Sequence, residues 1–124
     1  MAGAVETAPD RCAAQQLALR VANLGGGPAL ALVHVWGPPC RTPRLPVNVA
    51  LFDRSGQRVE ATIGIQSAFA PTTLSPSVEV IAGFNFLYLC GQRRPVRVVA
   101  EAGPYPTTGR LPHGIAACIH DLGP

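Results

Sequence analysis

The sequence has no lysine and little charge of either sign. Among its 124 residues, ten arginines oppose seven acidic residues for a formal net charge of +3, and only 14% of residues are charged, against about 25% in an average soluble protein. Nucleic-acid binding requires basic residues on one face with aromatic residues among them, but here the aromatic residues stand apart from the arginine groups. We therefore expect no nucleic-acid partner. An anion-binding patch at Arg41 and Arg44, or at Arg93, Arg94 and Arg97, is the alternative.

A long apolar run is also missing. No run approaches the roughly 20 residues that cross a bilayer, so the sequence predicts no transmembrane segment. Residues 1–11 lack the basic and apolar regions of a signal peptide and look instead like the small, polar spacer that follows a cleavage or lipidation site. We expect a flexible spacer at residues 1–11 and a single domain at residues 12–124. We also expect the native chain to begin upstream of Met1, with a lipid anchor there as one option.

Four cysteines are present without a C-x-x-C pair, which argues against the common zinc and dithiol redox motifs. The intervals between Cys12, Cys40, Cys90 and Cys118 are 28, 50 and 28 residues. Of the three pairings open to four cysteines, we favour Cys12–Cys40 with Cys90–Cys118, because each bond would tie a terminal segment to a neighbouring strand. Disulfides indicate an oxidising compartment, so we expect a secreted or cell-surface protein. Four buried free thiols in a cytosolic protein are the alternative.

Thirteen glycines and thirteen prolines divide the chain into short segments, and none of these is a helix-length amphipathic run. A short helical turn capped by Asp10 is expected before the first strand. Alternation of large apolar side chains with small or polar ones predicts strands at residues 17–23, 29–36, 46–53, 58–65, 78–80, 84–90, 96–100 and 115–119. In the second of these segments, Trp36 and His34 fall on the same side as the leucines.

Turns and loops complete the predicted layout. The turn at residues 53–57, with Gly56 where a positive φ is wanted, joins the strands on either side of it in a hairpin. Residues 84–90 are apolar on both faces, which indicates a central strand. Residues 67–76 and 103–114 are rich in proline, glycine, serine and threonine and are expected to be long surface loops. This pattern predicts an all-β fold, a two-sheet antiparallel sandwich of seven or eight strands.

Several short motifs also follow one another in a characteristic order. In chain order they are Cys12, Gly25–Gly27, Pro39-Cys40, Arg41-Thr42-Pro43, Phe52-Asp53-Arg54-Ser55-Gly56-Gln57, Val80-Ile81-Ala82-Gly83, Cys90 and Cys118. Over about residues 12–120 this order resembles a family of exported β-sandwich domains of unknown function, common in lipoproteins and secreted proteins of high-GC Gram-positive bacteria. The resemblance implies an Ig-like sandwich with two disulfides outside the cytoplasm. It implies no catalytic residues.

Motifs of known catalytic chemistry are absent from the sequence. It has neither Gly-x-Ser-x-Gly nor a P-loop, the motifs of serine hydrolases and of phosphate-binding loops. A metal site needs three or four convergent ligands, and the only histidines are His34, His113 and His120. A Cys–His nucleophile would require Cys118 beside His120, and a disulfide at Cys118 would remove its thiolate. We therefore expect no enzyme, no metal site and no cofactor.

Binding residues are expected in the two long loops. Phe69 and Tyr105 fall there, where an exposed aromatic ring is a contact anchor, and Arg110 is their polar neighbour. The alternative is that both rings pack beneath their loops. We expect a non-catalytic extracytoplasmic binding or interaction module of the cell envelope, with a protein partner or self-association. A structural subunit of an assembly, such as a decoration protein or filament, is the second hypothesis.

Overall fold

The computed structural model describes residues 10–24, 27–111 and 118–120, and strands dominate these ranges. In chain order the elements are the 3-10 turn η1 (Ala14–Gln16) and the strands β1 (Leu17–Leu24), β2 (Gly27–His34), β3 (Cys40–Thr42), β4 (Leu45–Phe52), β5 (Ala61–Gly64), β6 (Ala68–Phe69), β7 (Thr72–Leu74), β8 (Glu79–Gly83), β9 (Asn85–Leu89), β10 (Arg97–Ala102), β11 (Tyr105–Arg110) and β12 (Cys118–Ile119). The all-β prediction is confirmed. The described strands outnumber the seven or eight expected, because breaks divide extended segments, as Phe84 does between β8 and β9.

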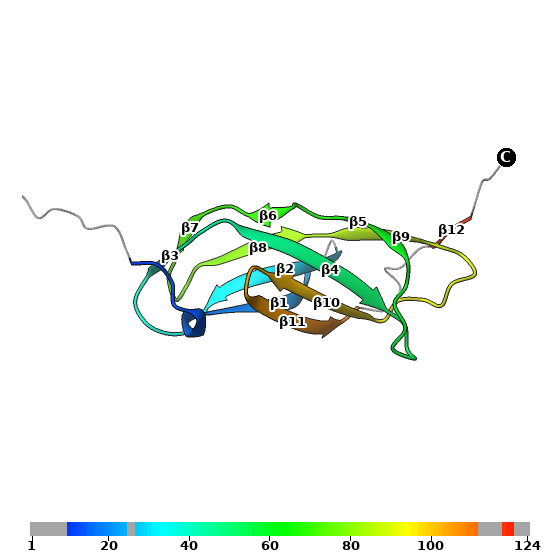
Figure 1. Ribbon diagram of the computed structural model, residues 1–124, viewed down its shortest axis with the longest axis horizontal. Helices are drawn as coiled ribbons and strands as arrows, with labels where there is room; N and C mark the ends of the chain where they lie inside the picture. Colours follow the sequence, from blue (N-terminus) through cyan, green and yellow to red (C-terminus); the bar gives the residue numbers. More distant parts are fainter. Residues whose placement is uncertain (1–9, 25–26, 112–117, 121–124) are drawn as a thin grey trace, which may run out of the picture.

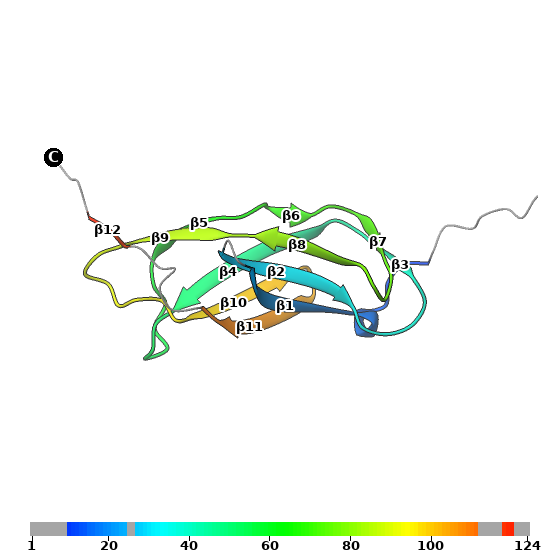
Figure 2. The same ribbon diagram turned by 180° about the vertical axis from the view of Figure 1, so that it is seen from behind.

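The strands form two layers in a sandwich-like arrangement (Figures 1 and 2). One layer has the strand order β11-β10-β4-β6, and the other has β1-β2-β8. Because β9 follows β8 after one residue, the second layer continues into β12-β9-β5, and the β3–β7 pair lies at the end of the molecule where β2 ends. The described ladders are antiparallel except that of β12 with β9. The sandwich prediction is therefore confirmed.

The core lies between these layers and is built from alternating inward residues. Leu30 and Leu32 of β2 face Leu51 of β4 and Val98 of β10, and all four side chains are fully buried. The expected inward faces of the first and third predicted strands are thus confirmed, and that of the second is confirmed except at Trp36, which is exposed. The predicted core rings are also buried, and they are Phe84, Phe86 and Tyr88.

The hairpin expected around residues 53–57 is only partly formed. Gly56 has φ 87°, as the turn requires, and the amide of Val59 still donates to the Leu51 carbonyl at 2.9 Å. Beyond that point the chain leaves β4, and β5 pairs with β9 instead. The predicted hairpin is therefore confirmed at its turn and at the antiparallel bridge of Phe52 with Arg58, and it is wrong for a ladder along the rest of residues 58–65. The alternation of apolar side chains in residues 58–65 is equally compatible with pairing to β9, a strand of the other layer.

Two other expectations need correction. The segments predicted as surface loops contain β6 and β7 in one case and β11 in the other. In β11, Pro106 is exposed and stands on an edge strand, where the missing N–H of proline costs no ladder hydrogen bond. Strand β9 has partners on both sides, but its Leu87 and Leu89 are 48% and 45% exposed, so it is not buried on both faces.

Both favoured disulfides are present. Cys12–Cys40 ties the segment before η1 to β3, and Cys90–Cys118 ties the end of β9 to β12. The described chain has no free cysteine, so the free-thiol alternative is excluded. Each bond fastens a segment whose ladder is short, since β12 pairs with β9 over only two residues.

Candidate anion-binding site

Arginine side chains gather where β4 ends, β10 begins and β11 ends. The antiparallel register places Phe52, Arg97 and Arg110 side by side across these three strands. Arg97 and Arg110 are therefore direct cross-strand neighbours, and both are exposed. Like charges in this position destabilise a sheet. An anion held between the two guanidinium groups would remove that cost.

The Phe52 ring holds one of the two arginines in place. The guanidinium carbon of Arg97 lies 5.5 Å from the centroid of this ring, within the range of a cation–π contact. Such a contact orients the guanidinium without using its N–H donors. Arg97 therefore keeps its planar fork of donors for a carboxylate or phosphate group.

Two loops bring further arginines to the same place. Arg54, from the turn after β4, and Arg94, from the segment before β10, line a pocket with Arg97 and Arg110. The pocket has a volume of about 350 Å³, and Val96 and Leu111 supply apolar lining. Small-molecule sites begin at about 300 Å³, so the pocket fits one compact group rather than a long chain.

Asp53 is the one carboxylate among the residues that line this pocket. Its Oδ1 accepts hydrogen bonds from the Ser55 amide at 2.9 Å, the Ser55 hydroxyl at 2.6 Å and the Gln57 amide at 3.0 Å. The Ser55 hydroxyl is the largest cause that lowers the pKa of Asp53; the two amides and the charge of Arg93 also lower it, and burial opposes them. The ionised carboxylate thus accepts hydrogen bonds within the turn. Because the pocket is lined by four arginines and this one carboxylate, its net charge is positive.

Three of the pocket's arginines lack a carboxylate partner in the part of the chain that the structure describes. No ion pair joins Arg54, Arg97 or Arg110 to an acidic side chain of residues 10–24, 27–111 or 118–120. Exposed guanidinium groups without partners bind an anion with little loss of existing contacts. The arrangement is suited to a carboxylate, sulfate or phosphate group.

The two aromatic rings expected as exposed anchors are buried. Phe69, on β6, has no exposed surface and pairs with Leu45. Tyr105, on β11, is 8% exposed, and burial raises the pKa of its hydroxyl. The expectation of exposed rings is therefore wrong, and the alternative that both pack inward is confirmed. Of the three expected binding residues, Arg110 lines the arginine pocket, and Phe69 and Tyr105 do not.

The expected arginine groupings are partly brought together. Arg94 and Arg97 meet at the pocket with Arg54 and Arg110, whereas Arg41 and Arg44 do not line it. Arg54 and Arg110 lie far from this group in sequence. Only the pairing of β10 with both β4 and β11 makes them neighbours.

The exposed aromatic residue that sequence reasoning missed is Trp36. Alternation placed it inward with His34, but β2 ends at His34, and Trp36 stands in the following loop with 63% of its surface exposed. The Gly37-Pro38-Pro39 sequence directly after it was the available signal, since such residues end a strand.

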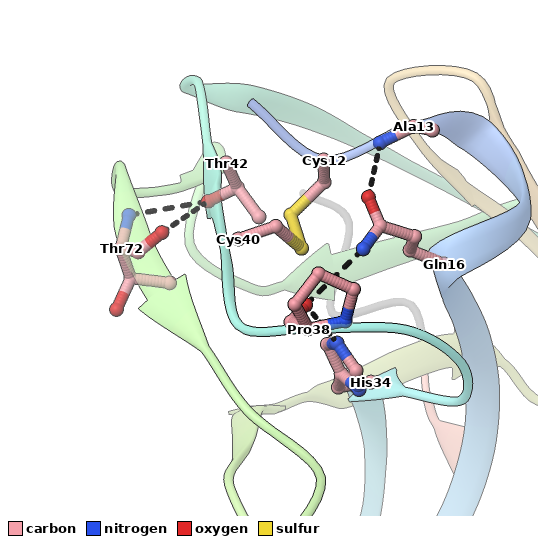
Figure 3. The surroundings of a disulfide bond; sticks show 8 residues. All are labelled: Cys12, Ala13, Gln16, His34, Pro38, Cys40, Thr42 and Thr72. Atoms are coloured by element: carbon pink, nitrogen blue, oxygen red, sulfur yellow. Dashed lines mark hydrogen bonds between the residues drawn. A yellow bond between two sulfur atoms is a disulfide. The ribbon is translucent and has the colours of Figure 1, made fainter. Parts of the chain in front are cut away.

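His34 has a structural role at the base of this loop. It is 8% exposed, and its Nε2 donates to the Pro38 carbonyl at 2.8 Å (Figure 3). Among the described residues, no group of three His, Cys, Asp or Glu side chains is arranged to hold a metal ion. Cys118 is in a disulfide, so it offers His120 no thiol, and His113 lies outside the described residues.

Comparisons of the chain with models of protein families, with curated proteins and with solved structures find no match. The resemblance to exported sandwich domains therefore stays a prediction. Within the described ranges, no helix has the length and apolar character needed to span a membrane.

Proposed function

We propose that this protein is a non-catalytic binding module that acts outside the cytoplasm and holds an anionic group in the arginine pocket. The observation that carries this proposal is the Arg97–Arg110 pair, directly opposed on β10 and β11 at a pocket that Arg54 also lines. A fold keeps opposed like charges at a cost. A bound anion that neutralises the two guanidinium charges would remove this repulsion.

The two disulfides support the location. Cytosolic thiols are kept reduced, whereas disulfides persist in exported proteins. Cys12–Cys40 and Cys90–Cys118 both close loops of the same sequence separation, 28 residues. In the chain-entropy model each such loop contributes about 3.5 kcal/mol to stability. A domain that depends on two such bonds is suited to an oxidising compartment, and an Ig-like member of an exported family would have this property.

Titration calorimetry with inorganic phosphate, pyrophosphate and citrate tests the proposed function. We expect saturable binding of at least one of these anions, weakened by salt because the site is open to solvent. The double variant Arg97→Gln/Arg110→Gln should lose at least about tenfold in affinity, or about 1.4 kcal/mol.

Arg20→Gln is the matched control for this titration. Arg20 is exposed on β1, stands opposite Ala31 and does not line the pocket. Its removal changes the net charge by the same amount as one pocket substitution and should leave affinity unchanged. Equal losses in Arg20→Gln and Arg110→Gln would show a general charge effect. No saturable binding of any of the three anions would contradict the proposal.

Self-association is a second candidate, because apolar side chains meet on an exposed strand pair. Leu89 of β9 and Ile119 of β12 are register partners and are 45% and 43% exposed, and Leu87 adds 48%. Exposed apolar surface of this kind marks contacts between proteins. Size-exclusion chromatography with light scattering at micromolar concentration should then show a species larger than the monomer. A monomer at every concentration would exclude an assembly subunit.

A further inference from the structure

The outer face of the layer that contains β1, β2, β8 and β9 is apolar, and this layer is the nearer one in Figure 2. In residues 79–89, odd-numbered side chains are exposed and even-numbered ones are buried or half-buried, so the alternation continues unbroken from β8 into β9. Strands β4, β10 and β11 of the opposite layer have no exposed large apolar side chain. On the strands of the apolar layer these side chains are Leu24, Ile81, Leu87, Leu89 and Ile119.

Strands β2 and β12 lie along the same edge of the run 79–89. The amides of Phe84 and Cys90 donate to the carbonyls of Pro28 and Ile119 at 3.0 Å and 2.8 Å. Successive amides of a strand point to opposite edges, so two amides an even number of residues apart point to the same one. Strand β5 pairs with β9 along the other edge. One straight boundary therefore separates β8 and β9 from β2 and β12.

Large apolar side chains of β8 and β9 have register partners across this boundary. Ile81 is opposite Ala31 of β2, and Leu89 is opposite Ile119 of β12. A rotation by 180° about an axis along the boundary exchanges the members of each pair. If a second copy so rotated is laid face to face on the first, Ile81 lies over Ala31, whose small side chain leaves room for it, and Leu89 lies over Ile119.

The outward face of β1, β2 and β8 carries one basic and one acidic side chain. Arg20 of β1 is opposite Ala31, and Glu79 of β8 is opposite Val33, so the two charges lie on either side of β2. Both are exposed, and no ion pair joins either of them to another residue of the described ranges. The same rotation brings Arg20 of each copy toward Glu79 of the other. The face is therefore complementary to itself in charge.

The area of this face is sufficient for a specific contact. With strands about 4.8 Å apart and a rise of about 3.4 Å per residue, β1-β2-β8 and β12-β9-β5 together cover about 500 Å². Two copies would bury about 1,000 Å², which is near the lower limit for a specific interface. Sheets that pack face to face keep their strands within about 30° of each other, as an axis parallel to the strands requires.

We propose that two copies of this chain pair through the outer faces of β1-β2-β8 and β12-β9-β5, about a two-fold axis that runs between β8 and β2. A different protein would have to supply a matching pair of charges, whereas a second copy already carries them. This inference rests on the second candidate function, self-association, and not on anion binding. Arg97 and Arg110 belong to the opposite layer, so the contact leaves the arginine pocket open in both copies.

Reversal of either charge tests the contact. Arg20→Glu places two acidic side chains together at both contacts of the dimer, and Glu79→Arg places two basic ones together there. Sedimentation equilibrium should show a Kd for the dimer that is at least about tenfold higher in each variant, or about 1.4 kcal/mol. The matched controls are Arg44→Glu, between β3 and β4, and Glu101→Arg on β10. They change the net charge equally and should leave Kd unchanged.

An equimolar mixture of Arg20→Glu and Glu79→Arg tests the two-fold relation. In a mixed pair, both contacts join unlike charges, so the mixture should dimerise with a Kd close to that of the wild type although each variant alone is largely monomeric. Circular dichroism checks that both variants are folded, as expected for substitutions of exposed side chains.

The outcomes separate this inference from self-association itself. A wild-type dimer that the two reversals weaken no more than the controls would overturn the proposed face and leave self-association standing. Weakening that the mixture does not reverse would overturn the two-fold relation. A wild type that stays monomeric at every concentration would overturn both the face and self-association, and the anion titration would be unaffected.

Discussion

Removal of one arginine from the opposed pair should stabilise the empty protein while it weakens anion binding. We choose Arg110→Gln, because Arg97 also contacts the Phe52 ring and its loss would remove a favourable interaction. Cross-strand charge pairs contribute about 0.2–1 kcal/mol. For a domain of this length, 1 kcal/mol corresponds to roughly 4 °C in Tm. The melting temperature of Arg110→Gln in low salt should therefore rise by about 1–4 °C.

Ionic strength separates charge repulsion from other causes of this rise. In 1 M salt the Debye length falls to about 3 Å, so the difference in Tm between Arg110→Gln and the wild type should disappear. Arg20→Gln, whose cross-strand neighbour is Ala31, should show no gain at either salt concentration. Thermal unfolding followed by circular dichroism measures all three proteins.

Addition of phosphate should reverse the order of stability. A ligand at 100 times its Kd stabilises the folded state by about 2.7 kcal/mol, and the wild type binds more tightly than Arg110→Gln. A lower Tm of Arg110→Gln in low salt without ligand would refute the repulsion argument. A gain that persists in 1 M salt would do so too.

Three further predictions concern stability. Phe69→Ala should lower the free energy of unfolding, measured with a chemical denaturant, by about 3–5 kcal/mol, because its ring is fully buried and truncation leaves a cavity. Trp36→Ala should change it by no more than about 0.5 kcal/mol, as substitutions at exposed positions do; similar losses in both variants would show that the two rings are packed alike. The pKa of Asp53 is below its ordinary value of 3.8, so the ionised carboxylate stabilises the folded state above that pH, and this stabilisation is lost as the pH falls further. Asp53→Asn should therefore flatten the acid side of the curve of stability against pH, and unchanged acid sensitivity would contradict this. Mild reductant should open Cys90–Cys118 before Cys12–Cys40, since Cys118 is exposed and Cys40 is 1% exposed; mass spectrometry after alkylation would show the reverse order if burial did not control access.

The buried aromatic rings show why the binding residues were not predictable. Phe69 and Tyr105 stand in segments rich in proline, threonine and glycine, which are typical of loops. Each ring is nevertheless on a strand that pairs with a strand of the core, β4 for Phe69 and β10 for Tyr105. Two-residue and proline-containing strands have no local signal of their own. The register partner lies outside the segment in both cases, 3 positions away for Tyr105 (Ala102) and 24 positions away for Phe69 (Leu45), so the pairing is not encoded within the segment.

The arginine pocket illustrates the same limit for function. The sequence places Arg94 and Arg97 close together, but Arg54 and Arg110 join them only through cross-strand register. A shift of one residue in that register would turn these side chains to the other face of the sheet. The electrostatic character of the pocket is thus a property of the tertiary structure.

Composition and periodicity by themselves determined that this chain is all-β and where its main inward faces lie, whereas cysteine spacing only favoured the disulfide pairing that the structure shows. Glycine and proline end a strand locally, and every second side chain of a strand points to the same face. Strand boundaries and inward faces therefore depend on neighbouring residues and need no distant partner. Only the tertiary structure decided that β5 leaves β4 for β9, that Phe69 and Tyr105 are buried, that Trp36 is exposed, and that four arginines share a pocket. Each of these outcomes depends on which strands lie side by side. The backbone of one strand can form hydrogen bonds with any of several similar strands, and only the packing of the whole core selects one arrangement.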